Sequence, residues 1–126
     1  MGVVQGKSSL QSTISLSTCE AELTASTWCA RQLMGLHNLL RELFPNVETP
    51  VLNGDNRAAN LLASNQASIR NHRHLQLPQL WIRSLSKDGK IKIFHVDTTK
   101  NISDILTKVL PSQKVNDLMT LMGYHF

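Results

Sequence analysis

Apolar residues recur every three or four positions from about residue 18 to residue 44, which predicts one long amphipathic helix. Ahead of it, Ser17 and Glu20 have the spacing of a capping box, in which the two side chains satisfy the first free backbone N–H groups. Pro45 and Asn46 end the helical pattern. The face expected to be buried is formed by Ala25, Cys29, Leu33, Leu36, Leu40 and Leu43.

Three segments have the pattern of strands. Residues 8–18 alternate apolar and polar side chains and are rich in Ser and Thr, which is typical of a half-exposed strand. Residues 49–53 form a short apolar strand. Residues 90–96, Lys-Ile-Lys-Ile-Phe-His-Val, form the clearest strand in the chain and follow an Asp-Gly turn at residues 88–89.

Further helices are predicted between and after these strands. Residues 54–56, Gly-Asp-Asn, open a helix that runs to about Ser64 and is followed by a polar loop over residues 65–74. Residues 75–85 are helical by pattern, with Pro78 in the first turn. A short helix begins near Asp104 and a last one at Pro111. This alternation of strands and helices predicts an α/β fold with parallel strands.

Composition and charge narrow the class of protein only slightly. The chain has 126 residues, of which 41% are hydrophobic, and this suits one domain with a real core. The net charge of +4 favours anionic partners. No apolar run reaches the roughly 18 residues of a membrane helix, and no secretory signal is visible, so we expect an intracellular protein without a membrane partner. Cys19 and Cys29 lie about 15 Å apart along the predicted helix, too far for a disulfide, and are expected to be reduced and buried.

Three acidic residues stand where helices are predicted to begin. Glu22 falls at the centre of the apolar stripe of the first helix, although a first-turn acid can also complement the helix dipole and reach solvent. Asp55 follows the strand 49–53, and Asp104 follows the strand 90–96; each can alternatively be explained as a helix cap. If the three converge on one sheet edge, their oxygens form the kind of cluster that Mg²⁺ prefers.

Four segments resemble one family in its order and spacing. Residues 15–25 contain Ser-Thr-Cys-Glu-Ala-Glu-Leu-Thr-Ala, and residues 54–60 read Gly-Asp-Asn-Arg-Ala-Ala-Asn where the family has Cys-Asp-Asn-Gln-Ser-Ala-Ile. Residues 88–96 match its Asp-Gly-x-Ile-x-Leu-x-x-Val strand, and residues 102–111 match its Leu-Ala-Asp-Ile-Leu-Thr-Lys-x-Leu-Pro ending. The chain thus resembles the ribonuclease H domain of copia-type retrotransposon polyproteins.

This resemblance implies a ribonuclease H-like fold, a mixed sheet flanked by helices, and hydrolysis of RNA in RNA–DNA hybrids by two Mg²⁺ or Mn²⁺ ions. It implies Glu22, Asp55 and Asp104 as the catalytic, metal-binding acids. It further implies a reverse transcriptase domain as partner in the full polyprotein, and a virus-like particle as the place of a full element. The nucleic-acid-binding residues that we expect are Asn56, Arg70, Arg73 and His74. Alternatively, residues 70–74 form a solvated loop.

The chain also departs from this family. The first catalytic aspartate and the first two strands have no counterpart here, so residues 1–126 are expected to form a single partial domain with an N-terminal truncation, weak or no cleavage, and self-association through an exposed sheet edge. At residues 73–80 the family's acid, Arg and second His are replaced by Gln76, Pro78 and Leu80. A non-catalytic remnant that binds nucleic acid or protein, or a decayed reading frame without function, are the alternatives.

Overall fold

The computed structural model describes residues 3–11, 17–64 and 77–124 of the chain. By their contacts the residues group into two compact units. The larger unit is Ile14–His95, and the smaller unit combines Met1–Thr13 with Val96–Phe126.

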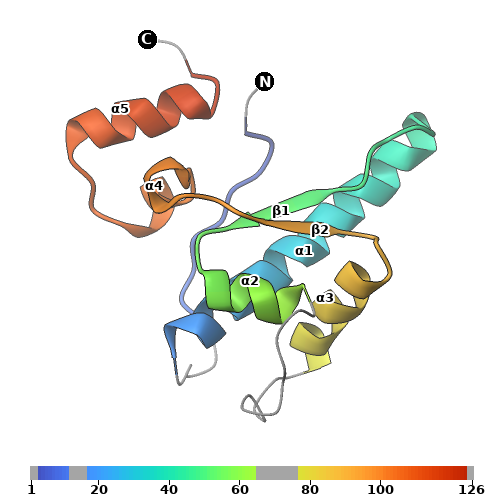
Figure 1. The fold of residues 1–126 in the computed structure, drawn as a ribbon. Coiled ribbons are helices and arrows are strands. Elements are labelled where there is room, and N and C mark those ends of the chain that lie inside the picture. The colour runs from blue at the N-terminus through green and yellow to red at the C-terminus, as the bar shows by residue number, and fades with distance from the viewer. Residues whose placement is uncertain (1–2, 12–16, 65–76, 125–126) are drawn as a thin grey trace. The chain divides into compact units, whose positions relative to one another are not determined.

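The larger unit contains a two-stranded parallel sheet, formed by β1 (Val51–Gly54) and β2 (Lys92–His95) (Figure 1). The register pairs Leu52 with Ile93 and Asn53 with Phe94. Leu52 is buried whereas Phe94 is 53% exposed, so one face of the sheet packs against the core and the other does not. Both predicted strands are therefore confirmed in position and parallel direction, and β2 is shorter at each end than the pattern indicated.

Helices α1 (Thr18–Leu43) and α2 (Arg57–Ala63) pack against this sheet, and α3 (Leu77–Lys87) packs against both of these helices (Figure 1). Two polar contacts tie them together, since Gln79 Nε2 donates to Thr24 Oγ1 and the Arg83 guanidinium donates to the carbonyl of Leu62 near the end of α2. The shared core consists of Leu23, Ala30, Leu52, Ala59, Leu62, Ala63, Ile82, Leu85 and Ile91.

Local signals explain where these helices begin and end. The Ser17 side chain accepts a hydrogen bond from Glu20 N at 3.2 Å, as expected for the cap of α1. Pro78 lies in the first turn of α3, where its missing N–H costs nothing. Gly89 ends α3 with a φ of 69°, and the N–H of Lys90 reaches back to the carbonyl of Leu85 at 2.9 Å, which is a Schellman motif.

The buried face of α1 differs from the predicted one. Leu23, Thr27 and Ala30 are buried, whereas Ala25 and Cys29 are exposed. Thr27 can enter the core because its hydroxyl donates to the carbonyl of Leu23 at 2.8 Å, so no hydrogen-bonding group is lost. Of the predicted face, Leu33 does pack partly buried against the core. The rest of the prediction failed because α1 has apolar residues on two faces, and the pattern alone favoured the leucine-rich one.

The smaller unit contains η1 (Thr98–Lys100), α4 (Asp104–Thr107) and α5 (Ser112–Leu121). The sequence pattern predicted α4 and α5, whereas η1 was not predicted. Leu118 of α5 is fully buried. The strand predicted over residues 8–18 is wrong where it is described: residues 8–11 are irregular, Leu10 is 99% exposed, and Thr18 begins α1. Residues 12–16 lie outside the described part of the chain.

The fold class is therefore mixed α/β, mostly helical, with a small two-stranded parallel sheet in the described residues. The expectation of a single partial domain over residues 1–126 stays a prediction.

Candidate functional site

Asp55 lies directly after β1 and directly before α2. Sequence reasoning offered a helix cap as its simplest explanation, and this explanation is wrong. The cap of α2 is Asn56, whose Oδ1 accepts a hydrogen bond from Ala59 N at 3.0 Å. Asp55 is half-buried, and within the described residues its carboxylate has no hydrogen-bond or ion-pair partner. Its position at the end of a parallel strand is thus unexplained by local structure.

Gly54 and Asn60 hold the backbone beside Asp55, and sequence reasoning did not assign either a role. Asn60 Nδ2 donates to the carbonyl of Gly54 at 2.8 Å. A Cβ atom at position 54 would collide with Oδ1 of Asn60. The available signal was a double departure from the family pattern, which has Cys and Ile at these two positions.

Glu22 lies near the start of α1 and is half-buried. It follows from the helical geometry that Glu22 is rotated by about 100° from Leu23, a fully buried neighbour. The inference that Glu22 occupies the centre of the core-facing stripe is therefore wrong, because the actual stripe is formed by Leu23, Thr27 and Ala30. Glu22 lies at the flank of the buried face.

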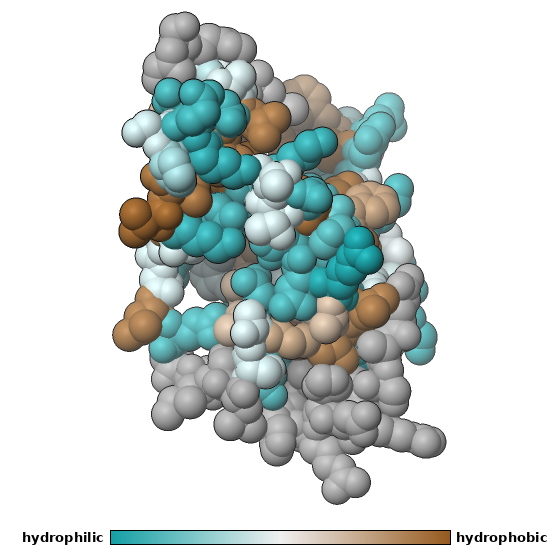
Figure 2. Space-filling model, turned by 60° about the vertical axis from the view of Figure 1, so that its left-hand side comes forward, coloured by the Kyte–Doolittle hydropathy of each residue, from teal (hydrophilic) through white to brown (hydrophobic). Residues whose placement is uncertain are grey.

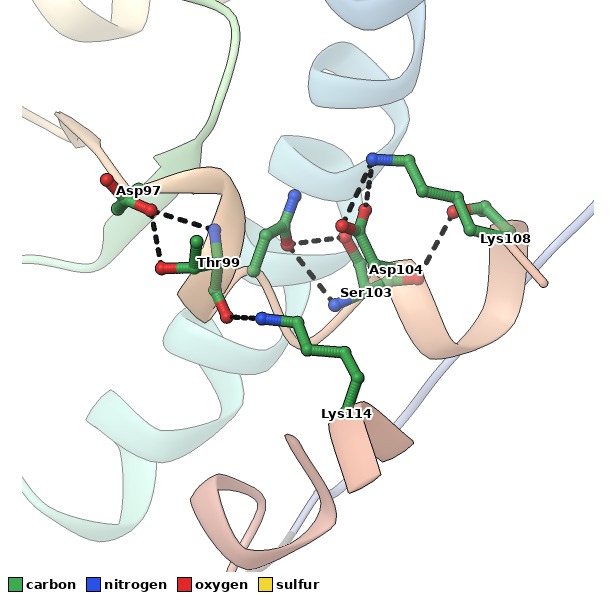
Figure 3. A network of polar contacts seen from close by, with 8 residues as sticks. Asp97, Thr99, Ser103, Asp104, Lys108 and Lys114 are labelled. Carbon is green, nitrogen blue, oxygen red and sulfur yellow. Dashed lines mark hydrogen bonds and ion pairs between the residues drawn. The ribbon is translucent and has the colours of Figure 1, made fainter. Parts of the chain in front are cut away.

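Asp104 is the first residue of α4 and is only 5% exposed. Lys108, one turn later, places its Nζ 3.0 Å from the Asp104 carboxylate (Figure 3). Asp104 is not the cap of α4, which is Ser103, and Asn101 Oδ1 accepts from both the N–H and the hydroxyl of Ser103. The carboxylate of Asp104 is thus compensated by the ammonium group of Lys108, the residue that follows α4.

Nearby contacts order the chain around Asp104 (Figure 3). Asp97 caps η1 by accepting from the N–H of Thr99 at 2.8 Å, and the ammonium group of Lys114 donates to the carbonyl of Thr99. These contacts connect η1 to α5 within the smaller unit.

Of the three predicted acids, Glu22 and Asp55 belong to the larger unit and Asp104 belongs to the smaller one. Among the residues that the structure describes, no group of three His, Cys, Asp or Glu side chains is placed to hold a metal ion. Convergence of the three acids therefore stays a prediction. Arg70, Arg73 and His74 lie outside the described residues, and Asn56 is used as a cap.

The two cysteines are free thiols, as expected. Burial raises the pKa of the Cys19 thiol, and the Glu20 carboxylate raises that pKa further. Burial also raises the pKa of Cys29, although part of this side chain is exposed, contrary to the prediction that it is buried. Neither thiol therefore has the depressed pKa of a nucleophilic cysteine.

A separate groove of about 530 Å³ lies in the larger unit, at the carboxyl end of α1. It is lined by Met34, His37, Asn38, Arg41, Pro45, Val47, Thr49, Leu85, Gly89 and Lys90. None of the predicted site residues is among them, so the groove adds nothing to the candidate site. In the described part of the chain, no helix has the length and hydropathy needed to cross a membrane.

Comparison with known proteins shows similarity to retrotransposon polyproteins. The chain is 32% identical over 124 residues to a retrovirus-related Pol polyprotein from transposon TNT 1-94 of Nicotiana tabacum, covering 98% of this chain and 9% of that protein. It is 30% identical over 114 residues to the transposon Ty1-NL2 Gag-Pol polyprotein of Saccharomyces cerevisiae, covering 86% of this chain and 6% of that protein.

The chain thus spans less than a tenth of the length of these relatives. No family model matches it, and no solved structure matches it significantly. The similarity nevertheless extends over most of the chain in both relatives. The chain is therefore homologous to a small segment of the Gag-Pol polyproteins of Ty1/copia retrotransposons.

Proposed function

We propose that this chain is part of the ribonuclease H domain of a copia-type retrotransposon polyprotein, and that the activity of that domain is hydrolysis of the RNA strand in RNA–DNA hybrids. On this proposal both units belong to one ribonuclease H-like domain. Support comes from the four sequence segments that resemble this domain and from the homology to Ty1/copia polyproteins. A small parallel sheet covered by helices is compatible with it.

The observation that carries the proposal is the placement of Asp55. In open α/β sheets, functional residues gather beyond the carboxyl ends of the strands. Asp55 occupies such a position after β1, and Asn56 performs the capping that would otherwise explain an acid there. Asp55 is half-buried and forms no hydrogen bond or ion pair with the described residues, so its carboxylate oxygens are open to a ligand. Asp55 is therefore the first residue to test.

The proposal includes Mg²⁺ or Mn²⁺ as the cofactor. Carboxylates such as those of Glu22 and Asp55 are the oxygen ligands that these ions prefer. The described residues, however, do not form a group of three donors for a metal. The role that we propose for Glu22, Asp55 and Asp104 is ion binding.

The proposed substrate is an RNA–DNA hybrid, and the proposed polypeptide partner is the reverse transcriptase domain of the same polyprotein. The formal charge of +4 favours a polyanionic substrate. Asn56 lies next to Asp55, and its side-chain carbonyl is engaged by Ala59. Its amide nitrogen remains the group that would contact the hybrid. Arg70, Arg73 and His74 are proposed as phosphate contacts from the sequence alone.

A cleavage assay with a hybrid labelled on its RNA strand tests this function directly. Because the first catalytic aspartate of the family has no counterpart here, we expect at most weak Mg²⁺-dependent cleavage, and we expect Asp55→Asn and Glu22→Gln to abolish it, with chelator as the metal-free control. Glu20→Gln is the matched control, because Glu20 lies two residues from Glu22 at the same helix start. Equal loss in all three variants, or cleavage that survives Asp55→Asn, would contradict the assignment.

One observation favours a non-catalytic alternative, in which the chain binds nucleic acid or protein without cleaving it. Asp104 is paired with Lys108 at 3.0 Å, and this ion pair competes with metal binding by the same carboxylate. Binding of the hybrid without cleavage, unchanged in Asp55→Asn and Glu22→Gln, would support this alternative. Fluorescence anisotropy with the same labelled hybrid measures that binding.

A further inference from the structure

The carboxyl-terminal half of α1 exposes a row of leucines, which we call the leucine face: Leu36, Leu39 and Leu43. Their side chains are 39%, 55% and 66% exposed, respectively. At about 100° per residue they lie within an arc of about 60° around the helix axis, on the side opposite the buried Leu23, Thr27 and Ala30. On the face of the protein drawn in Figure 2, hydrophobic side chains are scattered among hydrophilic ones. An aligned apolar row marks an interaction surface more strongly than scattered leucines do.

Gly35 borders the leucine face and leaves space beside it. A Cβ atom at Gly35 would find no atom within 4 Å. Gly35 and Leu39 are neighbours on the helix surface. Gly35, which has no side chain, leaves a hollow, and the Leu39 side chain protrudes beside it. A flat-sided partner would leave this hollow unfilled, whereas a partner with a protruding leucine would fill it.

Two charged residues follow the leucine face along one flank of α1. Arg31 and Glu42 are both exposed. They are eleven positions apart, which places them only about 20° apart around the axis and about 16 Å apart along it. Within the described residues neither forms an ion pair. One flank of α1 thus carries a positive charge at one end and a negative charge at the other, and both are available to pair with a partner.

We propose that the leucine face binds the leucine face of a second copy of this chain, with the two α1 helices antiparallel. A two-fold axis midway between Arg31 and Glu42 places Arg31 of each copy opposite Glu42 of the other, because an antiparallel pair brings the same flanks together. The same register places Leu36 beside its own symmetry mate and Leu39 over Gly35 of the second copy. In this one arrangement the exposed leucines become buried, Leu39 fills the space beside Gly35, and Arg31 pairs with Glu42.

The charge pattern selects this occupant and this orientation. A parallel pair would bring the flank that carries Arg31 and Glu42 against the opposite flank, where His37 and Phe44 lie, and would leave both charges unpaired. An unrelated partner would need an acidic and a basic side chain of its own, spaced about 16 Å apart. A second copy of this chain already has both. The surface is therefore self-complementary.

Sedimentation velocity of the full chain over a wide concentration range tests the proposal. We expect a reversible monomer–dimer equilibrium. Arg31→Glu and Glu42→Arg should each weaken it about tenfold, because each replaces two attractive contacts with two repulsive ones. An equimolar mixture of the two variants should recover the affinity, since the heterodimer restores both opposite-charge contacts. The double variant R31E/E42R should recover it as well.

Arg41→Glu is the matched control, because it makes the same charge change on the side of α1 that faces the groove. It should leave the dimer affinity unchanged, and far-UV circular dichroism should show all variants folded. A wild-type monomer at every concentration would overturn the proposal. A dimer whose affinity is unchanged by both charge reversals would also overturn it, because the contact would then lie elsewhere, for example at a free edge of the sheet.

Discussion

The amide of Asn60 fills the space beside Gly54 and donates to its carbonyl at 2.8 Å. Gly54 ends β1 and Asp55 follows it, so this contact holds the backbone that presents the proposed catalytic acid. Copia-type ribonuclease H domains resemble this segment but have Cys and Ile at these two positions. The two departures are therefore physically coupled: a side chain at 54 and an Asn at 60 compete for the same space.

This coupling predicts a non-additive pair of substitutions. Gly54→Cys should destabilise the chain by about 1–3 kcal/mol, since its Cβ would collide with the Asn60 amide. In the background of Asn60→Ile the same change should cost clearly less, because the competing amide is gone. Urea unfolding of the two single variants and the double variant measures the interaction.

Gly35→Ala is the control for this comparison of the single and double variants. Gly35 lies within α1 and has open space at its Cβ, so the change should stabilise the chain by up to about 1 kcal/mol when unfolding is measured at a concentration where the chain is monomeric and Gly35 is not in the proposed dimer contact. Additive effects of Gly54→Cys and Asn60→Ile would show that the contact at the end of β1 is unimportant.

The capping assignment predicts opposite behaviour for two adjacent residues. Asn56→Ala should cost about 1 kcal/mol, because it removes the acceptor for Ala59 N. Asp55→Asn should change the free energy of unfolding by less than about 0.5 kcal/mol, since Asp55 makes no contact among the described residues that the change would break. Chemical denaturation measures both. A large loss in Asp55→Asn would assign this residue to stability instead.

The ion pair in the smaller unit predicts that the stability of the chain depends on Lys108. Lys108→Met leaves the buried Asp104 carboxylate without its cation, and we expect a loss of about 1–2 kcal/mol, less than for a fully buried pair because the Lys108 side chain is 48% exposed. Adding Asp104→Asn should recover part of this loss by removing the unpaired charge. Lys100→Met is the control on an exposed lysine of η1, and hydrogen exchange at α4 reports the local stability. If Lys108→Met left the free energy of unfolding unchanged, this would show that water compensates the Asp104 carboxylate.

The thiols predict a pH dependence of alkylation. The pKa of Cys19 is raised by burial and then by Glu20, so at neutral pH the thiol stays protonated and should react more slowly than a free cysteine. Its reaction rate follows the thiolate fraction, so the rate should still be increasing at pH 9.0, the ordinary thiol pKa, and Glu20→Gln should move the midpoint of this increase to lower pH. Cys29→Ser isolates the signal of Cys19 in a stopped-flow or mass-spectrometric assay. A rate that is already maximal at pH 7 would contradict the assignment.

The same raised pKa values have a consequence for stability. Because the folded state holds these protons more tightly than the unfolded state, the contribution is fully present below the ordinary pKa and is lost as pH rises through the raised values. The chain should therefore lose stability at alkaline pH. The loss should be smaller when both cysteines are replaced by serine.

The sequence by itself determined most of the helix and strand positions. The Ser17 cap, the position of Pro78 and the Asp88-Gly89 turn act within a few residues of the chain, so their effect can be derived without knowing the tertiary structure. The same holds for α1, whose observed end at Leu43 is one residue from the predicted one. The motifs also established the resemblance that the homology to retrotransposon polyproteins supports.

Only the tertiary structure decided which side of each element is used. The long helix has two apolar faces, and the choice of Leu23 and Ala30 over Ala25 and Cys29 depends on what β1, α2 and α3 present to it. Likewise, Asp55 and Asn56 are equally good caps in sequence, and the geometry at the start of α2 selected Asn56. Burial and pairing arise between segments distant in the chain, and a local pattern does not contain that information.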